Sequence, residues 1–584
     1  MEQITLRPEY PVEPTDPLSV APNPRVMGQM YIGARKGHRD GMTLACATPR
    51  FPYEEVVDRY EHLHTAPGFS DLDFFNAHFD VNDPQEAAFI APPGMGIDTY
   101  IKFIRPLFVF PNTDQGNFDI WLPYDRSVAG IGRFGLHSFL WDGFHMGKGY
   151  AADGRWDLVL NIADNMEYQI NRFGYALNGS AYFYVTRSQP DYFAHLVRTV
   201  ADRIGPEALI RYLPTMERNH MGYWMDGLEE LSGMPDDGKV HTNRTLVRMP
   251  DGSFLNRYWD DGEGPRLESY KEDVETGKLA TQGLHGALRE RRLRKVYKDL
   301  RGAAASGWDF SSRWFRDGSS LATINTTDIA PCDLNSLLAY NEEMLAAAYE
   351  AAAQAGGYDS MTVEQCRDRA KMYREMHANR VAAINKYLWD PNTRIYRDYN
   401  FADRHQTGII SAAMTYPLYV GIANAEQSLG VADAIEQHLL YKGGIIATTT
   451  ENSNEQWDGG VPGGKRSKNV WAPFNWSAVR GFARTAHLLT AREVDFSPAT
   501  AERFLRLSET IKAAYMGGVE TVFDHTRMTA EKHRGDHPEI PANGGEYALV
   551  KVLGMTGETY QALRNVDPRD AADHLLMGRL ALAA

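Results

Sequence analysis

The sequence has few cysteines, no long apolar run and no excess of basic residues. Its three cysteines, Cys46, Cys332 and Cys366, lie far apart in no metal-binding spacing, which fits a reducing compartment without a disulfide framework. No apolar run reaches the length that spans a membrane, and residues 1–10 have neither the basic nor the apolar segment of a signal peptide. The sequence therefore predicts a cytoplasmic protein with no membrane partner.

Basic residues are in the minority. The chain has 61 Lys and Arg against 76 Asp and Glu, a formal net charge of −15 and no basic stripe, which argues against a nucleic-acid partner. An apolar content of 43% and a charged content of 23% over 584 residues are ordinary for a globular protein with a large core. This length fits several ordinary domains or one large repeat-like domain, and it gives no indication of an oligomeric state.

Cofactor and metal motifs are not evident either. The glycine-rich residues 459–465 follow no predicted strand, and Arg466 stands where a phosphate-binding loop needs a hydroxyl. The 18 histidines form no zinc-binding pattern, and Gly535 argues against a helix that would bring His533 and His537 onto one face. We therefore expect neither a metal nor a cofactor.

Helical periodicity dominates the chain after residue 156, whereas strand-like alternation is scarce. Gly174 and Gly205 are expected to end two helices, and Ser497, followed by proline, to begin another. The best strand candidates are residues 182–185 and 444–448. The spacing of apolar residues predicts helices over 158–173, 190–204, 334–355, 363–388, 474–489, 499–516 and 571–580.

These helices alternate with long polar loops, and long loops of this kind are usually functional. A closed ring of helices would bring such loops together at one end. We therefore predict an all-α fold, with an irregular Pro- and Gly-rich arm over residues 1–50 and a single helical domain over residues 51–584.

The most unusual stretch is residues 307–314, Gly-Trp-Asp-Phe-Ser-Ser-Arg-Trp, which fits neither a helical nor a strand period. Similar mixtures of aromatic, carboxylate, amide and guanidinium groups recur in residues 132–142, 177–190, 255–270 and 455–458. Flat aromatic faces with bidentate polar groups suit a small polyhydroxylated ligand. Carboxylates in such loops, without a metal or cofactor, are typical of glycoside hydrolases, in which one carboxyl is the acid and another the base or nucleophile.

The acid of such a pair needs a raised pKa, which hydrophobic neighbours supply. Asp309 has Trp308 and Phe310 on either side and fits this requirement. The pattern alone does not choose it over three other carboxylates in aromatic loops, Asp142, Asp260 and Asp458.

Residues 51–563 resemble the family 37 trehalases, inverting glycoside hydrolases of α,α-trehalose. Residues 307–314 are similar to the acid-bearing motif of that family almost without change. Gln456-Trp457-Asp458 resembles the start of its second signature. Further matches are residues 177–179, 186–190 and 265–270, and Glu531-Lys532 with Gly544-Gly545-Glu546-Tyr547 resembles the terminal acidic pair.

The resemblance implies an (α/α)6 barrel, a small α-glucoside as the partner and a role for each matching residue. Asp309 would be the general acid and Glu531 the general base. The residues implied to line the sugar subsites are Arg133, Phe134, Trp141, Asp142, Asn178, Arg187, Gln189, Arg266, Glu268, Trp457 and Glu546.

The sequence departs from the family pattern in its loops. One residue is inserted between Arg133 and Trp141, and residues 459–470 are longer and more basic than the family signature, with Lys465, Arg466 and Lys468. These loops would form the leaving-group subsite and a lid, so another small α-glucoside such as glucosylglycerol or glucosylglycerate is an alternative substrate. A non-catalytic sugar-binding relative is the second alternative. Both implied catalytic carboxyls are present, which favours an enzyme, with trehalose as its leading substrate.

Overall fold

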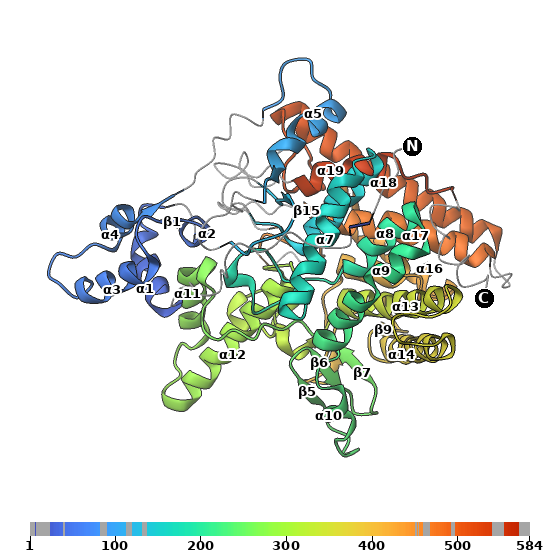
Figure 1. Cartoon of the computed structure of the whole chain (residues 1–584), viewed down its shortest axis with the longest axis horizontal. Coiled ribbons are helices and arrows are strands. Elements are labelled where there is room, and N and C mark those ends of the chain that lie inside the picture. Colours follow the sequence, from blue (N-terminus) through green and yellow to red (C-terminus); the bar gives the residue numbers. More distant parts are fainter. Residues whose placement is uncertain are drawn as a thin grey trace.

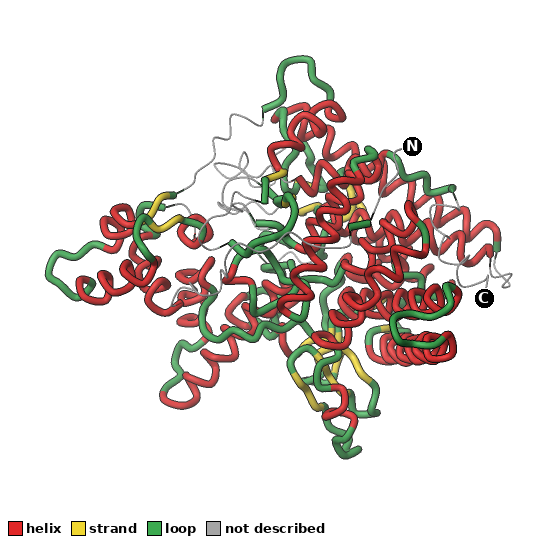
Figure 2. Tube along the Cα trace, viewed as in Figure 1, coloured by secondary structure: helices red, strands yellow, loops and turns green. Residues whose placement is uncertain are grey.

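The structure is a computed structural model (Figure 1). It describes residues 6–7, 24–38, 41–81, 90–112, 119–130, 137–449, 453, 455–459, 468–491, 497–539 and 554–570. Helices dominate these residues, with loops between them and short strands at few places (Figure 2). Several predictions concern residues outside the described ranges: Arg133, Phe134, Lys465, Arg466, Glu546 and the helix over 571–580.

Six helices contact one another in a closed ring at the centre of the domain. Each contacts the next, and the last contacts the first. Most of their residues are buried, as expected for helices covered on all sides. In ring order they are α6 (Leu140–Ala152), α8 (Phe193–Ile204), α13 (Cys332–Gln354), α15 (Tyr416–Tyr419), α17 (Ala472–Ala491) and α19 (Gly554–Arg564).

A second layer of helices covers this ring. Three of its members combine buried with exposed positions along their length, the pattern of an outer helix, and the other two are mostly buried. They are α7 (Trp156–Phe173) against α6, α9 (Pro206–Asn219) against α8, α14 (Val363–Tyr387) against α13, and α16 (Ala425–Ala434) and α18 (Pro498–Thr526) against α17. The predicted all-α (α/α)6 barrel is thereby confirmed.

Three helix boundaries predicted from the sequence agree with the structure. Helix α7 ends at Gly174 with φ +90°, and α8 ends at Gly205. At the start of α18, the hydroxyl of Ser497 accepts a hydrogen bond from the backbone N–H of Ala499, as expected for an N-cap.

Two predictions differ from the structure. The helix predicted over 499–516 is present as α18, but it continues ten residues past Met516 through two glycines, of which Gly518 lets the helix approach His533. A Cβ at that position would lie 2.3 Å from His533 Nε2. Residues 182–184 form a 3-10 turn rather than a strand, since their three aromatic rings are all buried against the core.

The first helices lie to one side of the ring, at the left of Figure 1. They are α1 (Pro24–Ala34), α2 (Gly41–Ala45), α3 (Tyr53–Leu63) and α4 (Asp71–His78). Helix α1 contacts α11 (Tyr270–Ala280), and α2 packs on the 3-10 turn Leu267–Ser269. Residues 24–34 and 41–45 are thus helical, and the domain boundary at residue 50 stays a prediction. The remaining helices are α5 (Ile97–Ile104), α10 (Leu228–Ser232) and α12 (Gly286–Ala305).

The described strands are two or three residues long and pair antiparallel. Residues 444–445 form a strand, as predicted. The pairs are β1 (Thr48–Pro49) with β2 (Phe79–Asp80), β3 (Val109–Phe110) with β4 (Arg126–Ser127), β9 (Trp389–Asp390) with β10 (Ile395–Tyr396), β13 (Leu440–Tyr441) with β14 (Gly444–Ile445), and β15 (Asn469–Val470) with β16 (His533–Arg534). The three-stranded sheets are β5 (His241–Asn243), β6 (Leu246–Arg248) and β7 (Phe254–Asn256), and β8 (Ile329–Ala330), β11 (Tyr399–Asn400) and β12 (His405–Gln406).

Candidate active site

The loop that follows α12 carries Asp309. It begins at Gly307, whose φ is +77° and whose missing side chain leaves room for an indole, since a Cβ there would lie 2.8 Å from Trp141 Cζ2. Trp308 is fully buried, whereas the Asp309 side chain is 39% exposed. The loop therefore fixes its aromatic residues in the core and turns its carboxyl outward.

Buried ion pairs hold this loop in place. Arg313 is bidentate to Asp333, at 2.7 and 2.8 Å, and to Asp398, at 2.6 and 2.8 Å. Asp333 begins α13, so the guanidinium fastens the loop to an inner helix. The basic residue of the motif is thus structural, and its two carboxylate partners satisfy the charge that burial would otherwise penalise.

Asp458 fastens the other end of the same loop. Its carboxylate accepts hydrogen bonds from the Ser311 hydroxyl at 2.7 Å, the Ser312 N–H at 2.6 Å and the Thr448 hydroxyl at 2.7 Å. Each of these three partners is a hydrogen-bond donor within the protein. Asp458 is therefore a positioning residue rather than a free acid or base.

Aromatic rings form a packed cluster beneath the loop. Trp457 stacks on Trp471 with ring centroids 3.7 Å apart and on Trp308 at 5.7 Å. Trp141 lies 5.7 Å from Trp457, and Phe474 packs against Trp308 at 4.1 Å. Trp141 and Trp457 are almost fully buried, so these rings shape the site from below.

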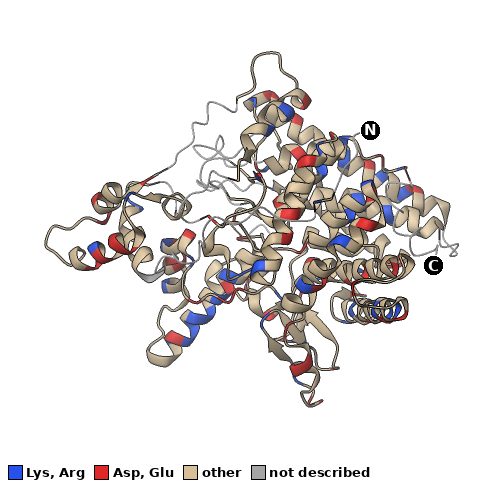
Figure 3. Ribbon diagram, in the orientation of Figure 1, with Lys and Arg blue, Asp and Glu red and all other residues tan. Residues whose placement is uncertain are grey.

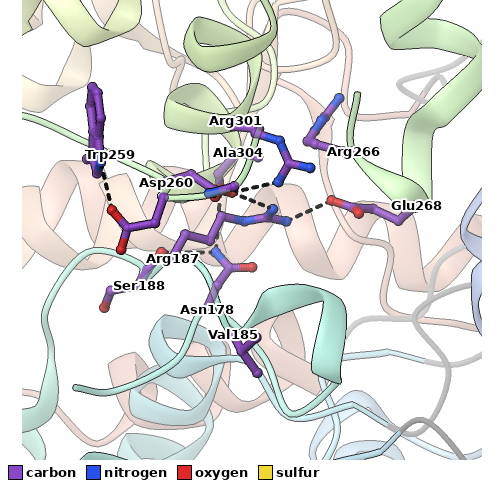
Figure 4. Close-up of polar contacts among 12 residues, drawn as sticks. Asn178, Val185, Arg187, Ser188, Trp259, Asp260, Arg266, Glu268, Arg301 and Ala304 are labelled. Carbon is purple, nitrogen blue, oxygen red and sulfur yellow. Dashed lines mark hydrogen bonds and ion pairs between the residues drawn. The ribbon is translucent and has the colours of Figure 1, made fainter. Parts of the chain in front are cut away.

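A ladder of arginines and carboxylates lies beside Asp309. Figure 4 shows Arg187 between two carboxylates, at 3.1 Å from Asp260 and 2.7 Å from Glu268. Arg301 contacts Asp260 from the other side at 3.2 Å. The pKa of Asp260 falls to about 2 because these cations and hydrogen bonds outweigh burial, and the pKa of Glu268 is lowered by Arg187 and Arg266 against the opposing effect of burial.

Basic residues of α12 support this ladder from outside. Figure 3 shows Lys and Arg gathered along the helix. The Lys298 ammonium donates to the carbonyls of Asp260 and Gly262, both at 2.8 Å, and Arg301 donates to the carbonyl of Gly264 at 2.8 Å. The helix thus holds the loop that presents Asp260 to Arg187.

Arg266 links the ladder to Asp309. Its guanidinium is bidentate to Asp273, at 2.8 and 3.0 Å, and its Nη1 lies 3.5 Å from Asp309 Oδ2. Burial nevertheless raises the pKa of Asp309 to about 6, because the opposing charges of Arg266 and Arg187 only partly offset it. Asp309 is therefore a partly exposed carboxyl that stays mostly protonated up to about pH 6.

Glu531 lies in the segment between α18 and β16. Its side chain is 9% exposed, and Lys532 Nζ lies 3.5 Å from its Oε2. The Thr556 hydroxyl donates to the Glu531 carbonyl at 3.1 Å and so ties this segment to α19. The pairing of β15 with β16 holds the same segment beside residues 469–470, which follow the second signature.

Gln456 joins the two candidate catalytic segments. Its Nε2 donates to the backbone carbonyl of Asp309, and its Oε1 accepts from Lys532 Nζ at 3.2 Å. Lys532 also lies over the Trp471 ring, 4.6 Å from its centroid. One amide side chain therefore spans between the Asp309 loop and the residue next to Glu531.

Asp142 lies near Glu531, in the first turn of α6. Burial raises the pKa of Asp142 to about 7, and the charge of Glu531 adds to this rise. A carboxyl in this state donates a hydrogen bond as readily as it accepts one, which suits a sugar hydroxyl. Among the four carboxylates left open by the sequence, Asp260 and Asp458 are committed to internal partners, while Asp309 and Asp142 keep transferable protons.

Two further predicted subsite residues bond to the backbone. The Asn178 amide donates to the carbonyls of Ser188 at 3.3 Å and Ala304 at 3.4 Å. The Gln189 Oε1 accepts from the backbone N–H of Trp141 at 3.1 Å. Both side chains are buried: Asn178 ties its loop to α12, which precedes the Asp309 loop, and Gln189 ties its loop to the first turn of α6.

Three residues with clear contacts were not among the predicted site residues. Gln456 and Lys532 stood in the quoted motifs, but only the structure shows that they meet. Glu455, whose pKa rises to about 7 through burial and the charges of Asp458 and Asp309, also lies near Asp309. Among the predicted lid cations, Lys468 contacts the Tyr441 hydroxyl and lies 4.2 Å from its ring centroid.

Comparisons with known proteins agree with this geometry. The sequence model of the family described as Trehalase matches residues 127–558. The chain is 32% identical over 567 residues to a periplasmic trehalase of Citrobacter koseri, covering 96% of this chain and 89% of that protein. The fold is similar to that of neutral trehalase Nth1 from Saccharomyces cerevisiae, with a TM-score of 0.54, 20% identity, and coverage of 77% of this chain and 75% of that one.

The predicted cytoplasmic location is contradicted by the Citrobacter relative, which is a periplasmic protein. The prediction failed because three free, widely spaced cysteines are compatible with either compartment. None of the helices in the described residues is both long and apolar enough to cross a membrane. The match over residues 127–558 and the Citrobacter relative agree with the open carboxyl of Asp309 and the arginine ladder beside it. The chain therefore belongs to the trehalase family and is a glycoside hydrolase.

Proposed function

We propose that the chain hydrolyses α,α-trehalose with inversion, using Asp309 as general acid and Glu531 as general base. The observation that carries this proposal is the electrostatic contrast around Asp309. Its carboxyl has a pKa raised to about 6 and is 39% exposed, although it lies beside an arginine ladder whose own carboxylates are held ionised. A proton donor that reaches the substrate needs this combination of accessibility and raised pKa.

On the leaving-group side of the displacement, the second glucose departs. Asp309 transfers its proton to the glycosidic oxygen as the bond to the first anomeric carbon breaks. Arg266, 3.5 Å from the carboxyl, stabilises the carboxylate that remains after the transfer. Because Arg266 is fixed by Asp273, it holds this position without reorganising.

In the same displacement, water attacks the opposite face of the sugar. Glu531 removes a proton from the water, and the ammonium of Lys532 lies 3.5 Å from its carboxylate. Gln456 bonds to both the backbone of Asp309 and the side chain of Lys532 and so fixes the distance between the two segments. The acid and the base therefore act on one bound sugar. Asp142, beside Glu531, would bind a hydroxyl of the same sugar.

The experiment that tests this proposal follows the products by proton NMR during the first turnovers. Inversion at one carbon of trehalose releases β-glucose, and the leaving glucose keeps its α configuration. Equal initial amounts of both anomers are expected. Release of α-glucose alone would show retention and contradict the roles assigned to Asp309 and Glu531.

A panel of α-glucosides tests the identity of the leaving group. Trehalose should give the highest kcat/KM in a comparison with glucosylglycerol and glucosylglycerate. A higher value for either of these two would replace trehalose as the substrate while leaving the roles of the carboxyls unchanged. Binding of trehalose without release of glucose would instead support a sugar-binding protein.

A further inference from the structure

A cysteine, a histidine and an aspartate lie in line outside the arginine ladder. Cys46 Sγ lies 3.2 Å from His137 Nε2, and His137 Nδ1 lies 2.8 Å from Asp119 Oδ1. Asp119 is in turn 3.4 Å from the buried Arg126. The order thiol, imidazole, carboxylate is that of an activated nucleophile with a base and a group that orients the base.

The charges around His137 favour its protonated form. Burial opposes a charge on the ring, but Cys46 and Asp119 outweigh it and raise the pKa of His137 to about 10. The other titratable groups that act on Cys46 or its neighbours are the tyrosines Tyr31, Tyr53, Tyr182 and Tyr184, together with Glu268 and Arg126. Burial raises the pKa of Tyr31, Tyr182 and Tyr184 well above the usual value, so these three are neutral.

The three cysteines of the chain differ in access. Cys332 and Cys366 are buried, at 1% and 0% exposure, whereas Cys46 is partly exposed at the end of α2. The His137 imidazole, 3.2 Å from the sulfur, is the kind of neighbour that a reactive cysteine needs, and Cys46 is the partly exposed residue of the three. None of the glycoside chemistry described above uses this thiol.

The trio is connected to the sugar site through one aromatic ring. The His137 ring meets the Tyr184 ring edge-on, with centroids 6.1 Å apart. The Arg187 guanidinium lies over the same Tyr184 ring, 5.0 Å from its centroid, and pairs with Glu268. Helix α2, which precedes Cys46, packs on the turn that carries Glu268, since a Cβ at Gly41 would lie 2.5 Å from the Glu268 carbonyl oxygen.

We propose that Cys46 is a reactive thiol that small-molecule disulfides modify, and that the adduct displaces His137 and weakens hydrolysis at the neighbouring sugar site. In the exchange, the Cys46 thiolate attacks one sulfur of the disulfide and forms a mixed disulfide. The other half leaves as a thiolate and takes a proton from solvent, so one S–S bond forms and one breaks. The effect on hydrolysis rests on the proposed function, whereas the thiol reactivity does not.

The test measures adduct formation on the full-length enzyme with dithiodipyridine, by release of thiopyridone and by peptide mass mapping. Cys46 is expected to react first, with Cys332 and Cys366 unlabelled in the native protein. At pH 7 it should react at least about tenfold faster than N-acetylcysteine, because the charged His137 ring lies against the sulfur. A rate no higher than that of N-acetylcysteine would overturn the assignment.

Two variants separate activation by His137 from simple exposure. His137→Gln should lower the Cys46 rate at pH 6 by at least about tenfold, because the stabilising charge is lost. Asp119→Asn keeps the imidazole and should lower the rate less. Equal rates in the wild type and in a folded His137→Gln variant would contradict the proposal, and the comparison of the wild type with N-acetylcysteine tests it even if that variant does not fold.

Activity is then measured on the labelled wild type and on Cys46→Ser. The unlabelled Cys46→Ser variant should hydrolyse trehalose like the wild type and resist dithiodipyridine. The labelled wild type should lose most of its activity and regain it after reduction with dithiothreitol. A complete adduct with unchanged activity would overturn the coupling to the sugar site, and mass mapping makes this outcome distinct from a failure of the proposed function.

Discussion

The two charged regions of the site differ in how their carboxylates are neutralised. In the arginine ladder, the guanidinium groups of Arg187, Arg266 and Arg301 are matched by three carboxylates, Asp260, Glu268 and Asp273. The pKa of Asp260 there falls to about 2. Beside the ladder, burial raises the pKa of Asp309 to about 6, and near Glu531 it raises the pKa of Asp142 to about 7.

This difference separates binding from proton transfer. Carboxylates that stay ionised at every working pH accept hydrogen bonds from sugar hydroxyls and hold arginines in place, but they donate no proton. Carboxyls with pKa values near neutrality exchange protons at little cost, which general acid catalysis requires. Both regions are highly charged, and burial acts to raise the pKa of Asp260 as well as that of Asp309, so burial alone does not distinguish them; the balance of opposite charges does.

The largest expected effect comes from removing the proton-transfer groups. Asp309→Asn and Glu531→Gln should each lower kcat for trehalose by at least about a hundredfold, because each removes one positioned acid or base. Binding of a glucose-like inhibitor, measured by calorimetry, should change little. If Glu531→Gln keeps near-normal turnover while Glu546→Gln does not, the base is Glu546 and Glu531 is a binding residue.

A smaller effect is expected from unbalancing the ladder. Arg187→Met removes the cation between Asp260 and Glu268 and leaves buried carboxylates with fewer partners, which should cost about 3–5 kcal/mol of folding free energy. The measurement is denaturant unfolding. The matched control is Arg155→Met, whose exposed pair with Asp157 should contribute at most about 1 kcal/mol. Equal losses in both variants would show that the ladder is not a special region.

The pH profile sharpens the comparison further. The acid must be protonated, so kcat/KM for trehalose should fall as pH rises through the free-enzyme pKa of Asp309, about 6. Asp260 in the ladder should add no limb above pH 3, since its pKa is about 2. An alkaline limb above pH 8 would mean that another group is the acid.

The smallest expected effect concerns Glu455. Its pKa rises to about 7 because of burial and of the charges of Asp458 and Asp309. Glu455→Gln removes a charge that disfavours ionisation of Asp309, so the alkaline limb should move toward lower pH by about half a unit or less. Glu436→Gln, a change at a surface carboxylate that pairs with Arg503, serves as the control and should leave the limb in place. A shift toward higher pH after Glu455→Gln would contradict this electrostatic picture.

The sequence predicted the helices and the family, because these depend on local signals. The apolar period of α14 and the glycine after α7 act within a few residues, and residues 307–314 form one contiguous motif. The partners of Arg313 could not be predicted, since Asp333 and Asp398 lie 20 and 85 residues away. The same holds for the bridge from Gln456 to Asp309 and Lys532, which joins three distant loops.

The choice among four carboxylates shows the limit most clearly. Asp260 and Asp309 both stand beside tryptophan or phenylalanine in the sequence, and both proved to lie near arginines. Asp260 has two guanidinium partners within 3.2 Å, whereas Asp309 has one at 3.5 Å. Local sequence does not encode that count of partners, because each partner arrives from another part of the chain.

The most direct test of the central claim, that Asp309 supplies the proton to the leaving group, uses a substrate whose leaving group needs none. Fluoride leaves α-glucosyl fluoride without protonation, so general acid catalysis is dispensable for it while water activation by Glu531 is not. The account predicts that Asp309→Asn loses at least about a hundredfold in kcat on trehalose but stays within about tenfold of the wild type on α-glucosyl fluoride. Equal losses on both substrates would contradict it, because Asp309 would then act on the glucosyl carbon or the water rather than on the leaving group.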